Sequence, residues 1–373
     1  MKSSFPNKKP IVFFMIGAIL VFSAGCAKLG PTTLKSERSN YNLAVQKTND
    51  EQLLLNLVRL KYRDTPFFME VSSVASQFTL STTGNASATL QEGVKGLFGL
   101  GGSLAITERP TVTYSPLQGD QFIQRVLSPL PLQTITLLYH SGWSVERIFR
   151  LCFQRMNNLK NAPGASGPTP KKAPQFEEFI EVSKLLGELQ SLDVLNLSYH
   201  NKNGIPQIIL NIASAANENE IFPLAFNTTQ KLIKALNLKG EFENYVITFS
   251  RKKNKPNQIR VVTRSLLGIL FYLSHAVEVP EQDNRKGKVT RTLKTSGKIF
   301  DWKEVTGELL RIRSDSSRPE NATLMVFYRG TWFYIDDSDL KSKSTFSLLS
   351  QIFSLQAGKI KDTTPLLTLP VGQ

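Results

Sequence analysis

Residues 77–114 read QFTLSTTGNASATLQEGVKGLFGLGGSLAITERPTVTY, and this stretch decides the architecture of the first half of the chain. From Gln77 to Gln91 every odd-numbered position is polar, and most of the even positions are apolar. Alternation with a period of two over about fifteen residues is typical of a β-strand, although the usual strand has only about 5–6 residues. Residues 103–114 repeat the alternation more loosely, and a glycine-rich apolar segment at 93–102 lies between the two. The pattern predicts a long β-hairpin at 76–114.

The start of the chain has the features of an export signal. Three lysines are followed by twelve uninterrupted non-polar residues at 11–22, counting one glycine. This run is too short to cross about 30 Å of hydrocarbon as a helix, which takes about 20 residues. Three small residues then lead to Cys26, and small residues leave a peptidase room to reach the backbone. The pattern indicates a signal peptide at 1–25.

The segment Ser23-Ala24-Gly25-Cys26 resembles the lipobox of bacterial lipoproteins. The resemblance implies cleavage between Gly25 and Cys26, with lipid on the Cys26 sulfur and on the new amino terminus. Acyl chains hold a protein on a bilayer at about 0.8 kcal/mol per buried methylene, without a spanning helix. Ala27 stands where lipoproteins retained in the inner membrane have Asp, so we expect the periplasmic face of the outer membrane. A plain cleaved signal with a chance cysteine is the alternative.

The expected location at the outer membrane limits the roles that the hairpin can have. A membrane-spanning β-strand needs about 9–11 residues with one apolar and one polar side, and both arms are long enough. Two strands alone would leave open edges in lipid, so spanning requires several subunits that each give a hairpin to one pore. The alternatives are a long arm over the protein's own core or a periplasmic partner, and a flexible or membrane-touching loop. The shortage of large aromatic residues favours the periplasmic arm.

Charge and cysteine content restrict the partners. The 373 residues have a net charge of +15, and the chain without its three leader lysines keeps 42 basic against 30 acidic residues, or +12. An envelope address argues against nucleic acid, so lipid headgroups, lipopolysaccharide phosphates or acidic proteins are the expected partners. Twelve of the basic residues fall within 251–298, against three acidic ones. These basic turns predict either solvated loops or a patch for an anionic lipid surface.

Cys152 is alone once Cys26 carries lipid, so no intrachain disulfide is expected. It recurs at helical spacing with apolar neighbours over an expected helix at 144–158. This spacing predicts that the Cys152 thiol is packed in an apolar stripe.

The remaining pattern predicts an α+β fold. An N-terminal helical region with the long hairpin precedes a mixed or antiparallel sheet with packed helices. The expected organisation is a signal peptide at 1–25, a lipidated tether at 26–35, a helical subdomain at 36–160, a linker at 161–174, an α+β subdomain at 175–358 and a tail at 359–373. The linker holds four prolines and two glycines.

Local patterns within this organisation predict the single elements. The sequence Thr48-Asn49-Asp50-Glu51 is a candidate capping box for an amphipathic helix. Strand pairs are expected around Asn203-Gly204 and Arg329-Gly330, and a further strand near 308–313. Residues 265–277 are apolar on nearly all sides and predict a buried helix.

Two further stretches, at 56–68 and at 328–358, resemble segments of hypothetical Gram-negative envelope lipoproteins without an assigned activity. The first includes the sequence NLVRLKYRDTPFF and the second begins with YRGTWFYIDD. The resemblance implies an envelope protein, and it brings no functional residues to assign.

No catalytic, cofactor-binding or metal-binding pattern stands out. The three histidines, His140, His200 and His275, are too scattered for ligand spacing, and a structural role is expected for each. The acidic sequence Asp336-Asp337-Ser338-Asp339 invites a metal interpretation, but a helix N-cap explains the same residues. A serine-hydrolase elbow and a phosphate-binding glycine loop are both missing from the sequence.

The sequence therefore favours a lipid-anchored envelope protein with a non-enzymatic structural or interaction role and no cofactor. One alternative is a subunit of an oligomeric outer-membrane pore or secretion assembly that donates hairpin 76–114. Another is a periplasmic hydrolase with a cryptic site.

Overall fold

The computed structural model describes residues 29–89, 97–168, 170–213, 221–238, 242–249, 255–357 and 367–370. The expected cleavage and lipidation residues, Gly25 and Cys26, lie outside these ranges. Two compact units divide the chain, Met1–Asp50 and Glu51–Gln373. Among the helices that the structure describes, none is long and apolar enough to cross a membrane.

The first described helix is α2, Leu29–Lys61. The expected helix start at Thr48–Glu51 is wrong, because α2 runs through these residues without a break. The Thr48 hydroxyl donates backwards to the carbonyl of Ala44 at 2.9 Å, which is the bond of a mid-helix threonine. No proline or glycine lies between positions 36 and 61, so nothing in the sequence ends the helix before its C-terminal turn.

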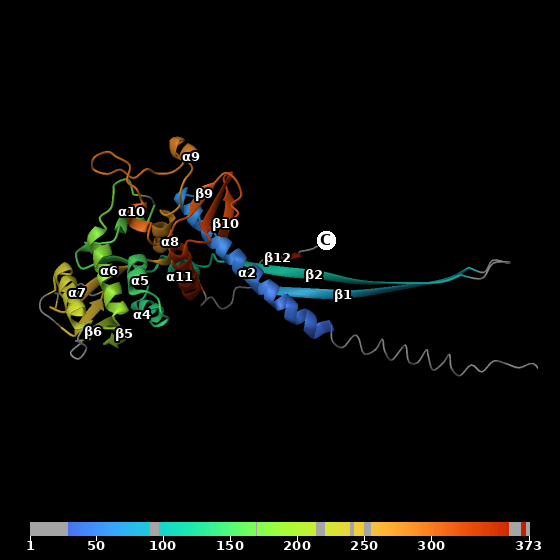
Figure 1. The fold of residues 1–373 in the computed structure, drawn as a ribbon, viewed down its shortest axis with the longest axis horizontal. Helices are drawn as coiled ribbons and strands as arrows, with labels where there is room; N and C mark the ends of the chain where they lie inside the picture. The colour runs from blue at the N-terminus through green and yellow to red at the C-terminus, as the bar shows by residue number, and fades with distance from the viewer. Residues whose placement is uncertain are drawn as a thin grey trace, which may run out of the picture. The chain divides into compact units, whose positions relative to one another are not determined.

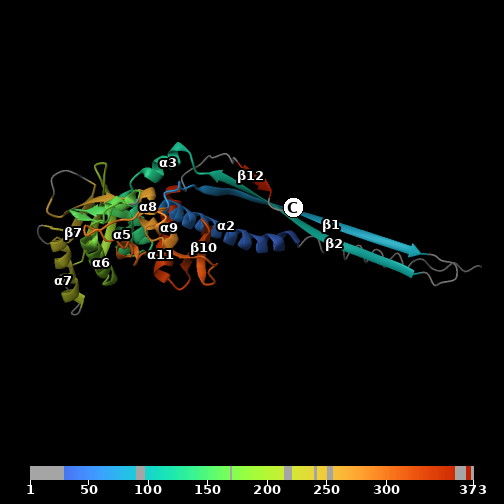
Figure 2. The same ribbon diagram turned by 90° about the horizontal axis from the view of Figure 1, so that it is seen from above.

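A three-stranded antiparallel sheet contains the long hairpin. Its order is β1-β2-β12, with bounds β1 Met69–Thr89, β2 Leu97–Pro116 and β12 Leu367–Pro370. Figures 1 and 2 show β1 and β2 side by side as a two-stranded ribbon, with β12 beside β2. The hairpin predicted at 76–114 is thus confirmed, and it extends at both ends of the prediction.

The largest sheet has six strands in the order β4-β3-β8-β7-β6-β5. The bounds are β3 Phe153–Met156, β4 Leu159–Lys160, β5 Leu195–Lys202, β6 Ile205–Ile212, β7 Asn244–Thr248 and β8 Gln258–Thr263. Strands β7 and β8 pair in parallel and the other neighbours pair antiparallel, so the sheet is mixed. Asn203 and Gly204 both have positive φ in the β5–β6 turn, as a type I′ hairpin requires.

Helices pack around this sheet and against the buried helix α8, Leu266–Ser274. They are α3 Asp120–Leu127, α4 Leu132–His140, α5 Val145–Cys152, α6 Glu177–Ser191, α7 Ile221–Ala235 and α11 Leu340–Ala357. The short helices α9 Glu281–Arg285 and α10 Lys303–Thr306 follow α8 along the chain. The hydroxyl of Ser265 caps α8 by accepting a hydrogen bond from the Gly268 N–H at 3.0 Å. The buried helix predicted at 265–277 is confirmed, and the α+β class is established by these elements.

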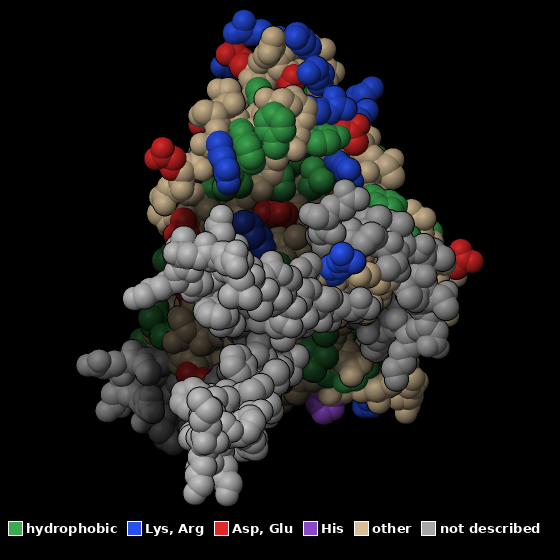
Figure 3. All heavy atoms as spheres, turned by 90° about the vertical axis from the view of Figure 1, so that its right-hand side faces the viewer, with side chains coloured by type: hydrophobic (Ala, Val, Ile, Leu, Met, Phe, Trp, Pro, Cys, Tyr) green, Lys and Arg blue, Asp and Glu red, His purple; other side chains and the backbone are tan. Residues whose placement is uncertain are grey.

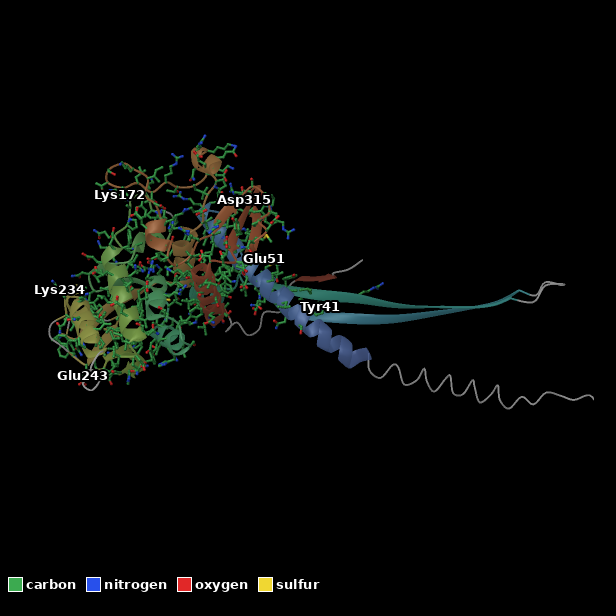
Figure 4. All side chains as sticks on the ribbon, in the orientation of Figure 1. Tyr41, Glu51, Lys172, Lys234, Glu243 and Asp315 are labelled. Carbon is green, nitrogen blue, oxygen red and sulfur yellow. The ribbon has the colours of Figure 1, made fainter. Side chains whose placement is uncertain are left out.

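A small antiparallel sheet, β10-β11-β9, precedes α11. Its strands are β9 Arg313–Asp315, β10 Ala322–Tyr328 and β11 Thr331–Asp336. The strand expected near 308–313 is wrong, because Leu309, Leu310 and Ile312 are buried in a connecting segment and β9 begins only at Arg313. Strand β9 ends at Asp315, which is labelled in Figure 4. The Asp315 carboxylate accepts the Ser317 N–H at 2.8 Å.

The helix expected at 144–158 is also too long. Helix α5 ends at Cys152, and Phe153–Met156 form β3, which pairs with β8. Cys152 and Met156 are both fully buried, so the apolar stripe is present although its second half is a strand. The raised pKa of the Cys152 thiol, to about 12, follows from this burial.

The proline-rich segment 161–174 contains the short 3-10 helix η2, Pro163–Ser166. Asn161, Ala162 and Ala165 are fully buried, and η2 packs against α8. The large sheet draws strands from both sides of the segment. The expected subdomain boundary at 161–174 does not coincide with the division after Asp50.

Candidate functional site

The hairpin is the most unusual surface that the sequence builds, and its ladder is nearly uninterrupted. Pairing runs from Met69 opposite Pro116 to Thr89 opposite Leu97, with one register shift between Val71 and Ser73. Residues opposite each other in an antiparallel ladder share a face, and each face takes every second residue. The register therefore decides how the alternating sequence of the two strands is combined.

The register of the ladder places the apolar positions of β1 opposite the apolar positions of β2. Even-numbered positions of β1 face even-numbered positions of β2, as in the pairs Leu80–Ile106 and Ala86–Leu100. Most even positions are apolar: Phe78, Leu80, Ala86, Ala88, Phe98, Leu100, Leu104 and Ile106. Most odd positions are small and polar: Gln77, Thr79, Ser81, Thr83, Asn85, Ser87, Thr89, Ser103 and Thr107. A shift of one residue would have mixed the two sets.

Charge is missing from the distal part of the ladder. Positions 77–89 and 97–107 contain no Asp, Glu, Lys or Arg, and Glu108 and Arg109 are the first charged residues on β2 toward its base. Thirteen residues of strand span about 43 Å, or about 33 Å if tilted by about 40°. This matches the roughly 30 Å of hydrocarbon in a bilayer.

The base of β1 is held by two amide side chains from the last turns of α2. Asn56, fully buried, donates to the Phe67 carbonyl at 2.8 Å and accepts from the Phe67 N–H at 2.9 Å. Gln52 makes the equivalent pair of bonds to Met69, at 2.9 and 2.7 Å, at an exposed position. The two side-chain amides thus make the paired N–H and C=O hydrogen bonds that a neighbouring strand would make, and they orient the chain where it enters β1.

Aromatic packing continues this anchorage, and we call residues 67–69 together with 116–117 the hairpin root. Phe68 is buried against Phe122 of α3 and Phe353 of α11, with ring centroids 6.1 and 5.0 Å apart. Its carbonyl accepts the Leu117 N–H at 2.9 Å, which closes the base of the ladder. Both strands of the hairpin therefore start from the packed core.

Residues 56–68 and the β10–β11 turn meet beside this root. Asp64 accepts hydrogen bonds from the Tyr328 hydroxyl at 2.6 Å and from Arg329 at 2.9 Å. The Arg329 guanidinium lies 4.9 Å from the centre of the Tyr62 ring, and the Tyr62 hydroxyl donates to Asp283 at 2.8 Å. Every ionisable group of this cluster has a partner, so the cluster joins the end of α2 to the β10–β11 turn.

A polar cleft of about 470 Å³ lies between α5, α6 and the start of α11. Its charged lining residues are Glu146, Arg147, Arg150, Lys184, Glu188, Glu308 and Lys341. Arg150 is almost fully buried and reaches Glu146 and Glu308, each at 2.9 Å. Burial alone would raise the pKa of Glu308, but hydrogen bonds from Arg150 and Lys184 outweigh it and lower the pKa. These carboxylates are committed to ion pairs that tie the helices together.

A second group of buried cations lies deeper in the core. Arg264 is fully buried, and its guanidinium donates to the carbonyls of Arg150, Leu151 and Phe153 at 2.6–3.0 Å. They lie at and just after the C-terminal end of α5, where helix carbonyls lack intrahelical partners, and Asn161 Nδ2 also donates to those of Arg150 and Phe153, each at 2.8 Å. Burial lowers the pKa of Arg264 to about 10. Arg264 therefore acts as a structural cap for α5.

A buried lysine, Lys61, and a buried histidine, His275, lie near Arg264. Lys61 is 8 % exposed, and burial lowers its pKa to about 8. His275 stacks on Trp302 with ring centroids 3.7 Å apart, and neither of its ring nitrogens makes a hydrogen bond of normal geometry to the part of the chain that is described. Burial and the nearby Lys61 charge hold the pKa of His275 well below 6.5.

The structure does not bring the histidines together with a candidate nucleophile in a cleft. His140 ends α4 at the surface, and His200 lies on exposed β5, where its Nε2 is 3.2 Å from the Ser198 hydroxyl. The polar cleft is lined by Ser144 and Ser191 but, within the described residues, by no histidine. Among those same residues no group of three His, Cys, Asp or Glu side chains could hold a metal ion.

The acidic side chains at 336–339 bind groups of their own turn, of the start of α11 and of β9. Asp339 accepts the Ser342 N–H at 3.0 Å and so caps α11, as the sequence predicted. Asp336 accepts the Ser338 N–H at 3.0 Å and pairs with Arg313 at 3.1 Å.

Many residues of the basic turns at 251–298 also have partners. Lys288 pairs with Asp283 at 2.6 Å and Lys294 with Glu304 at 2.8 Å, while Arg264 is buried. Figure 3 shows Lys and Arg side chains gathered at the upper end of one face, with Asp and Glu side chains among them. Residues 251–254 lie outside the described part of the chain.

Sequence reasoning missed Asn56, Lys61 and Arg264. Asn56 and Lys61 interrupt the apolar positions Leu53, Leu54, Leu57, Val58 and Leu60, and a polar residue within such a run is the signal that could have found them. Arg264 directly precedes the apolar segment 265–277, but its function depends on carbonyls that are distant in sequence. Comparisons with protein-family models, with curated proteins and with solved structures find no match for this chain.

Proposed function

We propose that this chain is a lipid-anchored protein of the cell envelope, held at the periplasmic face of the outer membrane through Cys26. It acts without catalysis, through contacts that its hairpin makes with another envelope component. The basic turns at 251–298 give it a further, salt-sensitive contact with anionic lipid headgroups.

One observation supports this proposal above the others: a paired ladder of about twenty residues per strand whose distal part contains no charge. An isolated two-stranded hairpin is marginally stable in water, because one face has nothing to pack against. The root, in contrast, is held by buried bonds to Asn56 and by the packing of Phe68. A firmly held base, and a distal ladder to which the described strands add no third strand, suit a segment that binds a partner.

A truncation that respects the register tests the proposal. Replacing residues 80–106 with Asn-Gly joins Thr79 to its ladder partner Thr107 through a type I′ turn and leaves the root unchanged. We expect the variant to unfold at the same urea concentration as the wild type, followed by tryptophan fluorescence. Affinity capture of the tethered protein from membranes should then lose the components that depend on the hairpin. An unchanged set of captured components would contradict the proposal.

The anchor is tested separately by intact mass. The mature chain should begin at Cys26 and carry the mass of its acyl chains, whereas a Cys26→Ser variant should appear uncut or without lipid. An unmodified thiol on the wild-type protein would remove the anchor from the proposal.

A pore subunit is the second candidate, and the in-phase register of the hairpin favours it. Charges at the even positions Leu80 and Leu104 would meet hydrocarbon, where a cation costs about 2–4 kcal/mol at the bilayer midplane. Leu80→Lys combined with Leu104→Lys should therefore abolish channel conductance in planar bilayers. The matched control, Ser81→Lys with Ser103→Lys, places the same charges at odd positions and should keep the conductance while changing its ion selectivity. Equal effects of the two pairs would count against a pore.

A further inference from the structure

We infer that the partner of the hairpin is a second copy of this chain, with β1 of one copy pairing antiparallel to β2 of the next. The inference rests on the proposed function, because it names what the hairpin contacts. The backbone edges of the ladder support this pairing, and the pairing requires no lipid.

Both edges of the hairpin are free along the distal ladder in the described part of the chain. Strand β1 pairs only with β2, so within the described residues no further strand lies along the outer edge of β1, where Gln52 binds only Met69. Strand β2 pairs on its outer side with β12, and only through residues 111–114. Each edge therefore offers a row of backbone N–H and C=O groups that another strand can bind.

The distal parts of these edges lack the features that prevent pairing. Edge strands are commonly protected by charged residues, prolines or bulges. In this hairpin the bulge at Val71–Ser73, the charges of Glu108 and Arg109, and Pro110 all lie toward the base. The distal positions 77–89 and 97–107 have neither charge nor proline.

A second copy fits both edges at once. Strands β1 and β2 run in opposite directions, so β1 of one copy beside β2 of the next continues the antiparallel order. Even positions are mostly apolar on both strands, so pairing even with even positions, and hence odd with odd, continues the apolar face across the contact. Such a contact joins two different surfaces, and repeated copies close into a ring when the rotation allows.

Disulfide trapping between differently tagged copies tests this arrangement. One full-length chain carries Ser81→Cys in β1, and a second, with another tag, carries a single cysteine in β2. Because each chain has one introduced cysteine, a disulfide containing both tags joins two copies. Cys152 is fully buried, and tagged chains without an introduced cysteine measure any background from Cys26.

The second cysteine is placed in turn at the odd positions Gly101, Ser103, Ala105 and Thr107, which should share a face with Ser81 across the contact. Matched controls use the even positions Gly102, Leu104 and Ile106, on the opposite face. We expect the mixed-tag product at one or two neighbouring odd positions and none at the even positions, since a disulfide needs Cβ atoms about 3.5–4.5 Å apart.

Three results would overturn the inference. The first is the absence of a mixed-tag product at every position, and the second is a product of Ser81→Cys with itself that exceeds all mixed products, which means β1 pairs with β1. The third is trapping of a different envelope protein, which removes the second copy but leaves the proposed contact function standing. Failure of the proposed function would be seen in a different experiment: the Asn-Gly truncation would capture the same envelope components as the wild type.

Discussion

Acidification should destabilise the folded chain through one imidazole, that of His275. Burial, together with the charges of Lys61 and Arg264, holds the pKa of this ring well below 6.5. The Ala165 carbonyl favours the protonated ring, but it does not reverse the shift. The folded chain therefore keeps the ring neutral at pH values where the unfolded chain binds a proton.

The sign and size of the effect follow from linkage. Below pH 6.5 the unfolded state holds more protons than the folded state, so the free energy of unfolding falls as the pH falls. Each pH unit well below 6.5 costs about 1.4 kcal/mol for one proton. Between pH 7 and pH 5 the sum is at most about 2 kcal/mol, the limit for a folded-state ring that stays neutral throughout, because the transition at 6.5 lies within the interval.

His275→Phe removes the proton but keeps an aromatic ring to stack on Trp302. Urea unfolding at pH 5, 6 and 7, followed by tryptophan fluorescence, should show that the variant loses less stability than the wild type over this range, by at most about 2 kcal/mol. The lowered pKa values of Asp283 and Glu308 act at lower pH and are common to both proteins. An equal loss of stability in wild type and variant would refute the role given to His275.

Other residues give further predictions. Asn56→Ala leaves the Phe67 N–H and carbonyl without their partners and should cost about 2–3 kcal/mol in urea unfolding, whereas Gln52→Ala, which breaks the equivalent exposed bonds, should cost less than about 1 kcal/mol. Lys61→Met should stabilise the protein by about 3 kcal/mol at pH 7 and remove the rise in wild-type stability between pH 8 and 10.5, because only the folded chain loses this proton near pH 8. Cys152 should resist maleimide at pH 8 while folded, as read by mass, and react after denaturation; modification of the native protein would contradict its burial.

The parts of the fold that the sequence predicted are those set by local periodicity. The hairpin was predictable because its alternation persists over many residues, and α8 because its residues are apolar on nearly all sides. The end of α5 was missed because Cys152 and Met156 satisfy helical spacing although Met156 lies in a strand. The sequence at Thr48–Glu51 matches a capping box, but no residue in the preceding segment ends a helix. The helix that begins earlier therefore continues through Thr48.

Features that depend on distant contacts were not predictable. The hydrogen bonds between Asn56 and Phe67 form only when α2 and the start of β1 are adjacent. The capping role of Arg264 depends on where α5 ends. The alternation predicted two faces for each strand, but only the register showed that the faces of β1 and β2 coincide.

The burial of Arg264 also has a dynamic consequence. Its guanidinium reaches the carbonyls of Arg150, Leu151 and Phe153, the carbonyl of Asn161 and the hydroxyl of Ser166, so none of these segments can detach without stranding a charge in the interior. Small fluctuations are thereby suppressed, and this region opens only when the whole unit does. Amide protons in the last turn of α5 and at the start of α8 should consequently exchange with solvent deuterium at the rate of global unfolding, among the slowest in the molecule.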